Sequence, residues 1–333
     1  MPEKIADRCK KLVEELQLGK ASRVTDVTPL TGGVASDIAS FNLNGKTYCA
    51  KFALPKLKVA ADWYAPVHRN AAEYAWLEFM AATCPHLAVK LYGRSASLNG
   101  FVMEFISGKD VYLWKTALLN CEPDRGEAGS VGALLGQIQA ASTRSGFDKS
   151  PFQNRDDFQA LRIEPYLLFT AEKHADLKSE FNVLASQLYD NQAVLVHGDV
   201  SPKNILLRDA GPVILDAECA TMGDASFDPA FCLNHLLLKS FHLPDSRHSL
   251  LHSVEAFWNA YAAHLTSEDP ASLEARICRL LPALMLGRVD GKSPVEYLSA
   301  DTRDQVRIAG FELIRSPEEK LGPLMDRFKH FQK

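Results

Sequence analysis

One stretch of the chain, VLVHGDVSPKNILL at residues 194–207, limits what the chain can fold into more than any other. Its two apolar ends, residues 194–196 and 205–207, have the length and composition of short buried strands. The polar residues between them, among them His197 and Asp199, therefore lie in a loop held between two strands. Proteins often place binding and catalytic residues in such loops. We therefore expect a functional site here.

A β-hairpin follows the loop, because ILLRDAGPVILD at residues 205–216 contains two apolar runs separated by a turn at Asp209–Gly211. The hairpin returns the chain, so that Asp216 at its end could share one pocket with Asp199 and Asn204. A magnesium-dependent phosphoryl transfer needs a carboxylate to orient the acceptor hydroxyl and hard oxygen ligands for the metal. These three side chains supply both kinds of group at the expected spacing.

Length and composition exclude several other classes of protein. The 333 residues suffice for two lobes, and 47% hydrophobic and 23% charged residues are ordinary for a globular protein. A net charge of -4 argues against a nucleic-acid partner. The N-terminal segment has the apolar spacing of an amphipathic helix and is too short to span a membrane, so we expect no membrane partner. The 7 scattered cysteines form no CxxC pair, which favours a reducing cytoplasmic location.

The chain divides into two parts of different character. Residues 24–54 consist of short strand-like runs with turns, and a helix near residues 69–82 and strand-like runs at 86–95 and 100–108 follow. Apolar stripes at helical spacing dominate from Val111 onward. We therefore predict an α+β fold with a small antiparallel β-sheet lobe at residues 1–105, which leads with a helix and binds nucleotide. A larger, mostly helical lobe at residues 106–333 would hold the catalytic loop and the acceptor site.

The motif HGDVSPKN, followed by ILDAE, resembles the aminoglycoside phosphotransferase and choline kinase family. These enzymes are small-molecule kinases with a protein-kinase-like bilobal fold. The resemblance implies that ATP and Mg2+ are the cofactors and that Asp199 is the catalytic base. It also implies that Asn204 and Asp216 bind the metal, with Glu218 as a possible further ligand.

The resemblance extends to a predicted nucleotide site in the first part of the chain. A loop around LTGGVAS would cover the phosphates, a strand lysine would hold them, and a helix glutamate would pair with that lysine. The segment GFVMEFISG would connect the lobes, with a gatekeeper methionine and two backbone groups for the adenine edge. The residues in these roles are Thr31, Gly32 and Gly33 in the loop, Lys51, Glu73, the gatekeeper Met103, the Glu104 carbonyl and the Ile106 N–H.

Several polar residues have an ordinary structural interpretation beside a functional one. Asp228 is interpreted first as a helix N-cap, although the resemblance also implies that it braces the catalytic loop. His197 is interpreted as a packed residue that shapes this loop, and Lys203 either contacts phosphate or faces water. The basic residues Lys56, Lys58, His68 and Arg69 are interpreted as a solvated loop, and residues 287–298 as a surface connector.

The acceptor is the least defined part of the prediction. One segment resembles the corresponding segment of methylthioribose kinases: it contains the run KFALP, followed by a tryptophan, a proline and Arg69 ahead of Glu73. The catalytic loop differs, because methylthioribose kinases lack the metal-binding asparagine that Asn204 supplies. We expect a hydroxyl of a small sugar-like, polyol or amino-alcohol acceptor. The alternatives are an aminoglycoside-modifying phosphotransferase, which would need an acidic acceptor cleft that the C-terminal part does not suggest, and a catalytically inactive nucleotide-binding protein. The sequence does not indicate an oligomeric state.

Overall fold

A five-stranded antiparallel sheet forms the first part of the molecule. The computed structural model describes residues 4–30, 35–58 and 64–331. The strands lie in the order β1-β2-β3-β5-β4, so that β3 is central and pairs with both β2 and β5. The strands are β1 (Val24–Pro29), β2 (Ser36–Leu43), β3 (Lys46–Ala53), β4 (Leu91–Ser95) and β5 (Gly100–Glu104). The predicted strand at 86–95 is therefore shorter than expected, since β4 begins at Leu91.

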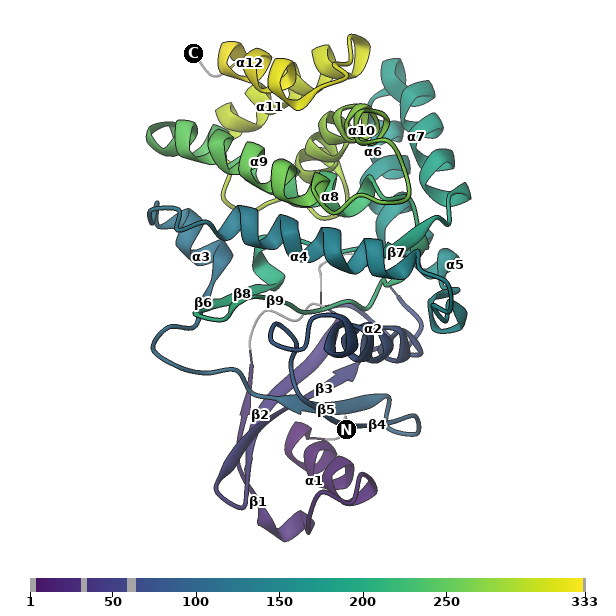
Figure 1. Ribbon diagram of the computed structural model, residues 1–333, viewed down its shortest axis with the longest axis vertical. Coiled ribbons are helices and arrows are strands. Elements are labelled where there is room, and N and C mark those ends of the chain that lie inside the picture. Colours follow the sequence, from purple (N-terminus) through teal and green to yellow (C-terminus); the bar gives the residue numbers. More distant parts are fainter. Residues whose placement is uncertain (1–3, 31–34, 59–63, 332–333) are drawn as a thin grey trace.

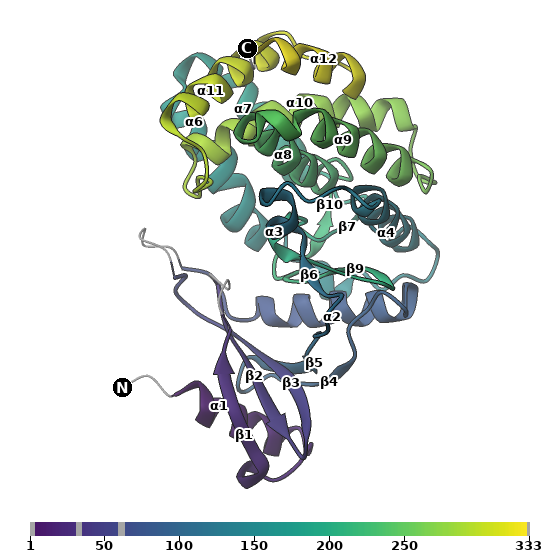
Figure 2. The same ribbon diagram turned by 90° about the vertical axis from the view of Figure 1, so that its left-hand side faces the viewer.

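The two faces of this sheet pack against different helices. Helix α1 (Ile5–Glu15) covers one face, where Phe41 and Phe52 are buried in a separate small core. Helix α2 (Arg69–Thr83) lies between the other face and the helical part of the molecule (Figure 2). Successive residues of a strand point to opposite faces. Lys51 of β3 consequently points away from Phe52, toward α2 and the second part of the chain.

Helices make up most of the second part, which lies beyond α2 from the sheet (Figure 1). Their centre is α8, in which every residue from Phe227 to Phe241 is buried, and α9, α10 and α11 pack around it. The bounds are α3 (Trp114–Leu119), α4 (Glu127–Ser142), α5 (Arg155–Phe158), a π-helical segment (Gln159–Leu168), α6 (Phe169–Lys173), α7 (Lys178–Asp190), α8 (Phe227–His242), α9 (Arg247–Ala262), α10 (Pro270–Asp290), α11 (Ala300–Arg315) and α12 (Leu321–Phe331).

Two small sheets position the predicted catalytic loop at the border of the two parts. β7 (Val194–Val196) pairs with β10 (Thr221–Gly223), and β8 (Ile205–Arg208) pairs with β6 (Tyr112–Leu113) and β9 (Gly211–Ile214). The strands on both sides of the loop and the hairpin that follows it are thus as predicted. Within the described residues, every helix is too short or too polar to span a lipid bilayer.

Candidate active site

The loop between β7 and β8 has a tightly constrained backbone. Gly198 adopts a φ of +83°, and a Cβ atom there would lie 2.7 Å from the Cβ of Cys219, so only glycine fits. The N–H of Asp199 donates to Nδ1 of His197 at 3.0 Å. The side-chain amide of Asn204 donates to the carbonyl oxygen of Asp199 at 3.1 Å. These bonds fix Asp199 relative to Asn204. They use the nitrogen of the Asn204 side-chain amide and not its Oδ1 atom.

Asp228 holds the same loop from the first turn of α8. Its carboxylate accepts hydrogen bonds from the N–H of His197 at 2.7 Å and from that of Gly198 at 2.9 Å. The N-cap residue of α8 is instead Ser226. The N-cap interpretation of Asp228 is therefore wrong, and its carboxylate satisfies two buried N–H groups of the predicted catalytic loop.

Replacing Asp228 with alanine should lower the free energy of unfolding by about 2–6 kcal/mol, because each of the two buried N–H groups left without a partner costs about 1–3 kcal/mol. Urea unfolding followed by fluorescence measures this change. The matched control is Asp269→Ala at the exposed N-cap of α10, where the side chain accepts from Ser272 N–H and the expected loss is about 1 kcal/mol. Equal losses in the two variants would contradict the bracing role of Asp228.

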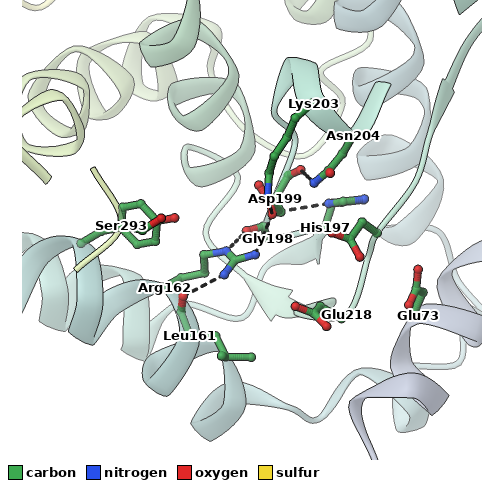
Figure 3. A network of polar contacts seen from close by, with 12 residues as sticks. Glu73, Leu161, Arg162, His197, Gly198, Asp199, Lys203, Asn204, Glu218 and Ser293 are labelled. Carbon is green, nitrogen blue, oxygen red and sulfur yellow. Dashed lines mark hydrogen bonds and ion pairs between the residues drawn. The ribbon is translucent and has the colours of Figure 1, made fainter. Parts of the chain in front are cut away.

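The Asp199 carboxylate is flanked by two cations. Lys203 Nζ lies 3.1 Å and an Arg162 guanidinium nitrogen 3.0 Å from its Oδ2, and Arg162 points at Asp199 from the π-helical segment (Figure 3). Arg162 is buried and also donates to the Gly198 carbonyl. Burial alone would raise the pKa of Asp199, but Lys203 and Arg162 hold it well below its usual range. Asp199 is therefore ionised at neutral pH.

His197 is a neutral structural residue of the loop, as predicted. It is buried, and its ring lies edge-on to Trp76 with 4.8 Å between ring centroids. Burial lowers the pKa of His197 to about 4. The ring therefore accepts the N–H of Asp199 without itself carrying a charge.

The low pKa of His197 predicts an acid-labile fold. As the pH falls from about 6.5 to about 4, the unfolded chain binds a proton at this residue that the folded protein does not bind. Stability should consequently decrease over this window, by about 3 kcal/mol from His197 alone. Urea unfolding between pH 7 and pH 4.5 measures the slope. His197→Asn, which keeps an acceptor for the Asp199 N–H, should flatten the slope, whereas His252→Asn at an exposed site should not. An unchanged slope in His197→Asn would contradict this assignment.

The β8–β9 hairpin returns Asp216 to the side of Asn204. The N–H of Leu215 donates to the Asn204 carbonyl at 2.9 Å, and Asp216 adopts a φ of +71°, which turns the chain directly after the strand. Lys51 Nζ contacts Asp216 and lies 2.6 Å from Glu73 Oε1. The hairpin, strand β3 and helix α2 therefore meet at one buried lysine.

The charges of this group stabilise one another. Burial opposes a charge on Lys51, but Asp216 and Glu73 raise its pKa above the usual value. Lys51 in turn lowers the pKa of Asp216, against the effect of burial. Both groups are consequently charged at neutral pH. These charges are compatible with the predicted roles of the two residues, a lysine that holds phosphate and an aspartate that binds a cation.

Arg69 links α2 to the segment that follows β9. Its Nε lies 2.9 Å from Glu218 Oε2, and its guanidinium donates to the Pro66 carbonyl at 2.8 Å and the Leu54 carbonyl at 2.8 Å. Arg69 is 1% exposed, so the interpretation of this residue as part of a solvated loop is wrong. One Glu218 oxygen is already occupied by Arg69, and a metal-binding role of Glu218 stays a prediction.

A cavity of about 530 Å³ opens between the sheet and the β8–β9 hairpin. Met103, Glu104 and Ile106 line its mostly apolar end, as a site for a planar base requires. Within the described residues, the N–H of Ile106 has no hydrogen-bond partner, which leaves this donor free for a ligand. The lining residues with chemistry to offer at the other end are Lys51, Glu73, Lys203, Asn204 and Asp216. The predicted loop residues Thr31, Gly32 and Gly33 lie outside the described residues.

The oxygen donors at this end fit a magnesium ion held together with a nucleotide. In the described part of the chain, no group of three or more His, Cys, Asp and Glu side chains could hold a metal by itself. Mg2+ usually binds through one or two carboxylates and takes substrate phosphates and waters as its other ligands. Asp216 and the Asn204 amide oxygen are hard donors on the wall of one cavity, which suits that mode of binding.

Comparisons with known proteins agree with this fold. The model of the phosphotransferase enzyme family matches residues 26–264, while a search of curated protein sequences finds no match. Amicoumacin kinase hAmiN, solved with AMP-PNP, Ca2+ and Ami, superposes with a TM-score of 0.59 at 14% identity over 95% of this chain and 97% of that chain. A choline/ethanolamine kinase family protein from Mesorhizobium loti superposes with a TM-score of 0.52 at 13% identity, over 99% of this chain and 95% of that chain. The choline kinase LicA from Streptococcus pneumoniae superposes with a TM-score of 0.50 at 16% identity, over 94% of this chain and 99% of that chain. At these identities the similarity establishes the fold, which is the predicted protein-kinase-like fold with a β-sheet part and a helical part.

Proposed function

Because the chain belongs to the phosphotransferase enzyme family, we propose that it transfers the γ-phosphoryl group of ATP to a hydroxyl of a small molecule. The observation that supports this most is the arrangement around the cavity of about 530 Å³. Lys51, Asn204 and Asp216 line its wall, and Asp199 lies at its edge through the bonds to Asn204 and Lys203. A nucleotide with its base near Ile106 would direct its phosphates toward these groups.

Asp199 is proposed to orient the acceptor hydroxyl and to receive its proton. The acceptor oxygen forms a bond to the γ-phosphorus, the bond from that phosphorus to the β,γ-bridging oxygen breaks, and ADP leaves. A carboxylate with a pKa well below its usual range is a weak base, so the proton transfers late, when the new O–P bond has largely formed. Most of the rate enhancement then comes from positioning and electrostatic stabilisation.

Cationic side chains would stabilise the charge that accumulates on the phosphoryl oxygens. Lys51 is charged and aligned by Glu73, and Lys203 Nζ reaches the Asp199 carboxylate at 3.1 Å. Mg2+ held by Asn204 and Asp216 would supply further neutralisation of the phosphates when bound.

The test is magnesium-dependent ATP consumption with pooled small hydroxyl compounds. The purified protein should consume ATP in at least one pool, and Asp199→Ala should serve as the blank. ATP binding without consumption in any pool would instead support the alternative of an inactive nucleotide-binding protein. Competition among the active compounds then orders the sugar-like, polyol and amino-alcohol acceptors, with an aminoglycoside included as the remaining alternative. A cytoplasmic location is part of this proposal.

A further inference from the structure

A buried lysine lies in the helical part of the molecule, on the central helix α8. Lys239 is 1% exposed and forms no ion pair with any described residue. Its Nζ lies 3.4 Å from the carbonyl oxygen of His235 and 5.1 Å from the ring centroid of Tyr297. Burial, together with Lys115 and Arg288, lowers the pKa of Lys239 to about 7. A buried ammonium without a counter-ion is costly to the fold.

A second buried cation faces the same region from α10. Arg288 is 8% exposed, and one of its terminal nitrogens donates to Tyr166 Oη at 3.1 Å and to Ser293 Oγ at 3.0 Å. Its Nε has no hydrogen-bond partner, and no described carboxylate forms an ion pair with it. A guanidinium is charged at every physiological pH. The interpretation of residues 287–298 as a surface connector is therefore wrong for Arg288, which lies in the last turn of a buried helix.

The acidic side chains near these cations are engaged by other lysines. Glu164 pairs with Lys292 at 2.9 Å, and Glu296 pairs with Lys115. The Tyr297 hydroxyl is buried and lacks a hydrogen-bond partner. Lys239 and Arg288 therefore face a region with positive charge in excess and with unused hydrogen-bond donors.

This region adjoins the catalytic aspartate through a single turn of helix. Arg162, which pairs with Asp199, lies four residues before Tyr166, which binds Arg288. From α8, the buried ring of His235 packs edge-on against Phe231, and Phe231 in turn against Tyr166. The π-helical segment and α8 therefore connect Asp199 with the two cations through a series of direct contacts, of which the last is the His235 carbonyl beside Lys239. We call Lys239 and Arg288 the cation pair.

Resting on the proposed function, we propose that the acceptor carries an anionic group, a carboxylate or a phosphate, which the cation pair binds while the acceptor hydroxyl lies at Asp199. An anion would supply the counter-charge that Lys239 and Arg288 lack, and its oxygens would accept from the free Arg288 Nε–H and the Lys239 ammonium. The same charges repel polycationic acceptors such as aminoglycosides.

Matched acceptors test the charge preference directly. One set is glycerol, glycerate, glycerol 3-phosphate and 1-amino-2,3-propanediol, and the other is glucose, gluconate, glucose 6-phosphate and glucosamine. Within at least one set, kcat/KM for an anionic member should exceed that of the neutral member at least 10-fold, with the cationic member lowest. Comparison of the carboxylate with the phosphate member identifies which anion is bound. A neutral or cationic acceptor used as well as the anionic ones would overturn the inference while leaving the proposed function intact.

Variants of the cation pair separate ligand binding from a structural role. Lys239→Met should raise KM for the preferred anionic acceptor about 100-fold, and Arg288→Met should do so as well. Without acceptor, Lys239→Met should also raise Tm by about 2 °C, because it removes a buried unpaired charge. Lys178→Met, at an exposed surface pair, is the matched control and should change neither quantity. A lower Tm for Lys239→Met with an unchanged KM would assign the lysine to the fold alone.

A binding measurement decides the inference even if no acceptor is phosphorylated, an outcome that would contradict the proposed function. Glycerate or glycerol 3-phosphate should then still raise Tm of the wild-type protein in a saturable manner, and glycerol at equal concentration should not. Lys239→Met should lose this stabilisation. Equal stabilisation of the variant and the wild type would show that the cation pair does not bind the anion.

Discussion

Replacing Asp199 with asparagine should lower turnover by about three orders of magnitude while ATP binding stays nearly intact. Loss of a positioned general base costs about 10²–10⁴-fold, and asparagine keeps the size of the side chain but cannot accept the hydroxyl proton. The hydrogen bonds that shape the loop use the backbone of Asp199. The asparagine Oδ1 can still accept hydrogen bonds from Arg162 and Lys203, so the variant should fold. Steady-state kinetics and ATP titration measure the two effects separately.

The control is Asp209→Asn, an exposed residue in the turn of the β8–β9 hairpin. This variant removes one negative charge close in sequence to Asp199 but on the surface, so turnover and ATP affinity should both stay unchanged. Wild-type turnover in Asp199→Asn would show that another group receives the proton. A large loss of ATP affinity in this variant would instead indicate that Asp199 acts through the nucleotide.

Replacing Asp216 with asparagine should weaken ATP binding in the presence of Mg2+ by about 100-fold, since changes around a bound metal typically cost 10–100-fold in affinity and this residue is a proposed ligand. ATP binding without Mg2+ should change much less, because Lys51 and the apolar end of the cavity are retained. Isothermal titration of ATP with Mg2+ and with EDTA separates the two conditions. Asp209→Asn again serves as the control.

The comparison of the two conditions is the decisive part of this second experiment. If Asp216 acts only as a partner of Lys51, the asparagine variant should lose affinity equally with and without Mg2+. An unchanged magnesium requirement would contradict its role as a metal ligand. Thermal unfolding of the variant without ligand shows how much the loss of the Lys51 partner affects the fold itself.

The sequence predicted the elements whose signals are local. Short apolar, strand-like runs between turns defined the strands, and the turn at Asp209–Gly211 defined the hairpin that brings Asp216 beside Asn204. The proximity of Lys51 to Glu73 followed from the resemblance to known kinases and not from local pattern, because the two residues lie on different elements. The roles of these side chains in nucleotide and metal binding stay predictions that the experiments above address.

Arg162, Arg69 and the cation pair were missed or interpreted as solvated, because their partners are remote in sequence. Arg162 meets Asp199, and Arg69 meets Glu218, only after the helices have packed. A signal was nevertheless present. Arg162 interrupts the run ALRIEPYLL, and Lys239 and Arg288 interrupt the runs LLLKSF and LMLGRV. A charged residue inside an apolar run is often buried with it, and such a buried residue usually needs a partner or a ligand.

The Arg69–Glu218 and Lys51–Asp216 pairs join the sheet part of the molecule to the segment after β9. A motion that pulled these elements apart would have to break both ion pairs at once, so we expect it to be rare. Entry of nucleotide and exit of ADP must then use a hinge that leaves both pairs closed. The chain from Phe105 to Val111, which crosses between the two parts without regular secondary structure, is where we expect the backbone angles to change.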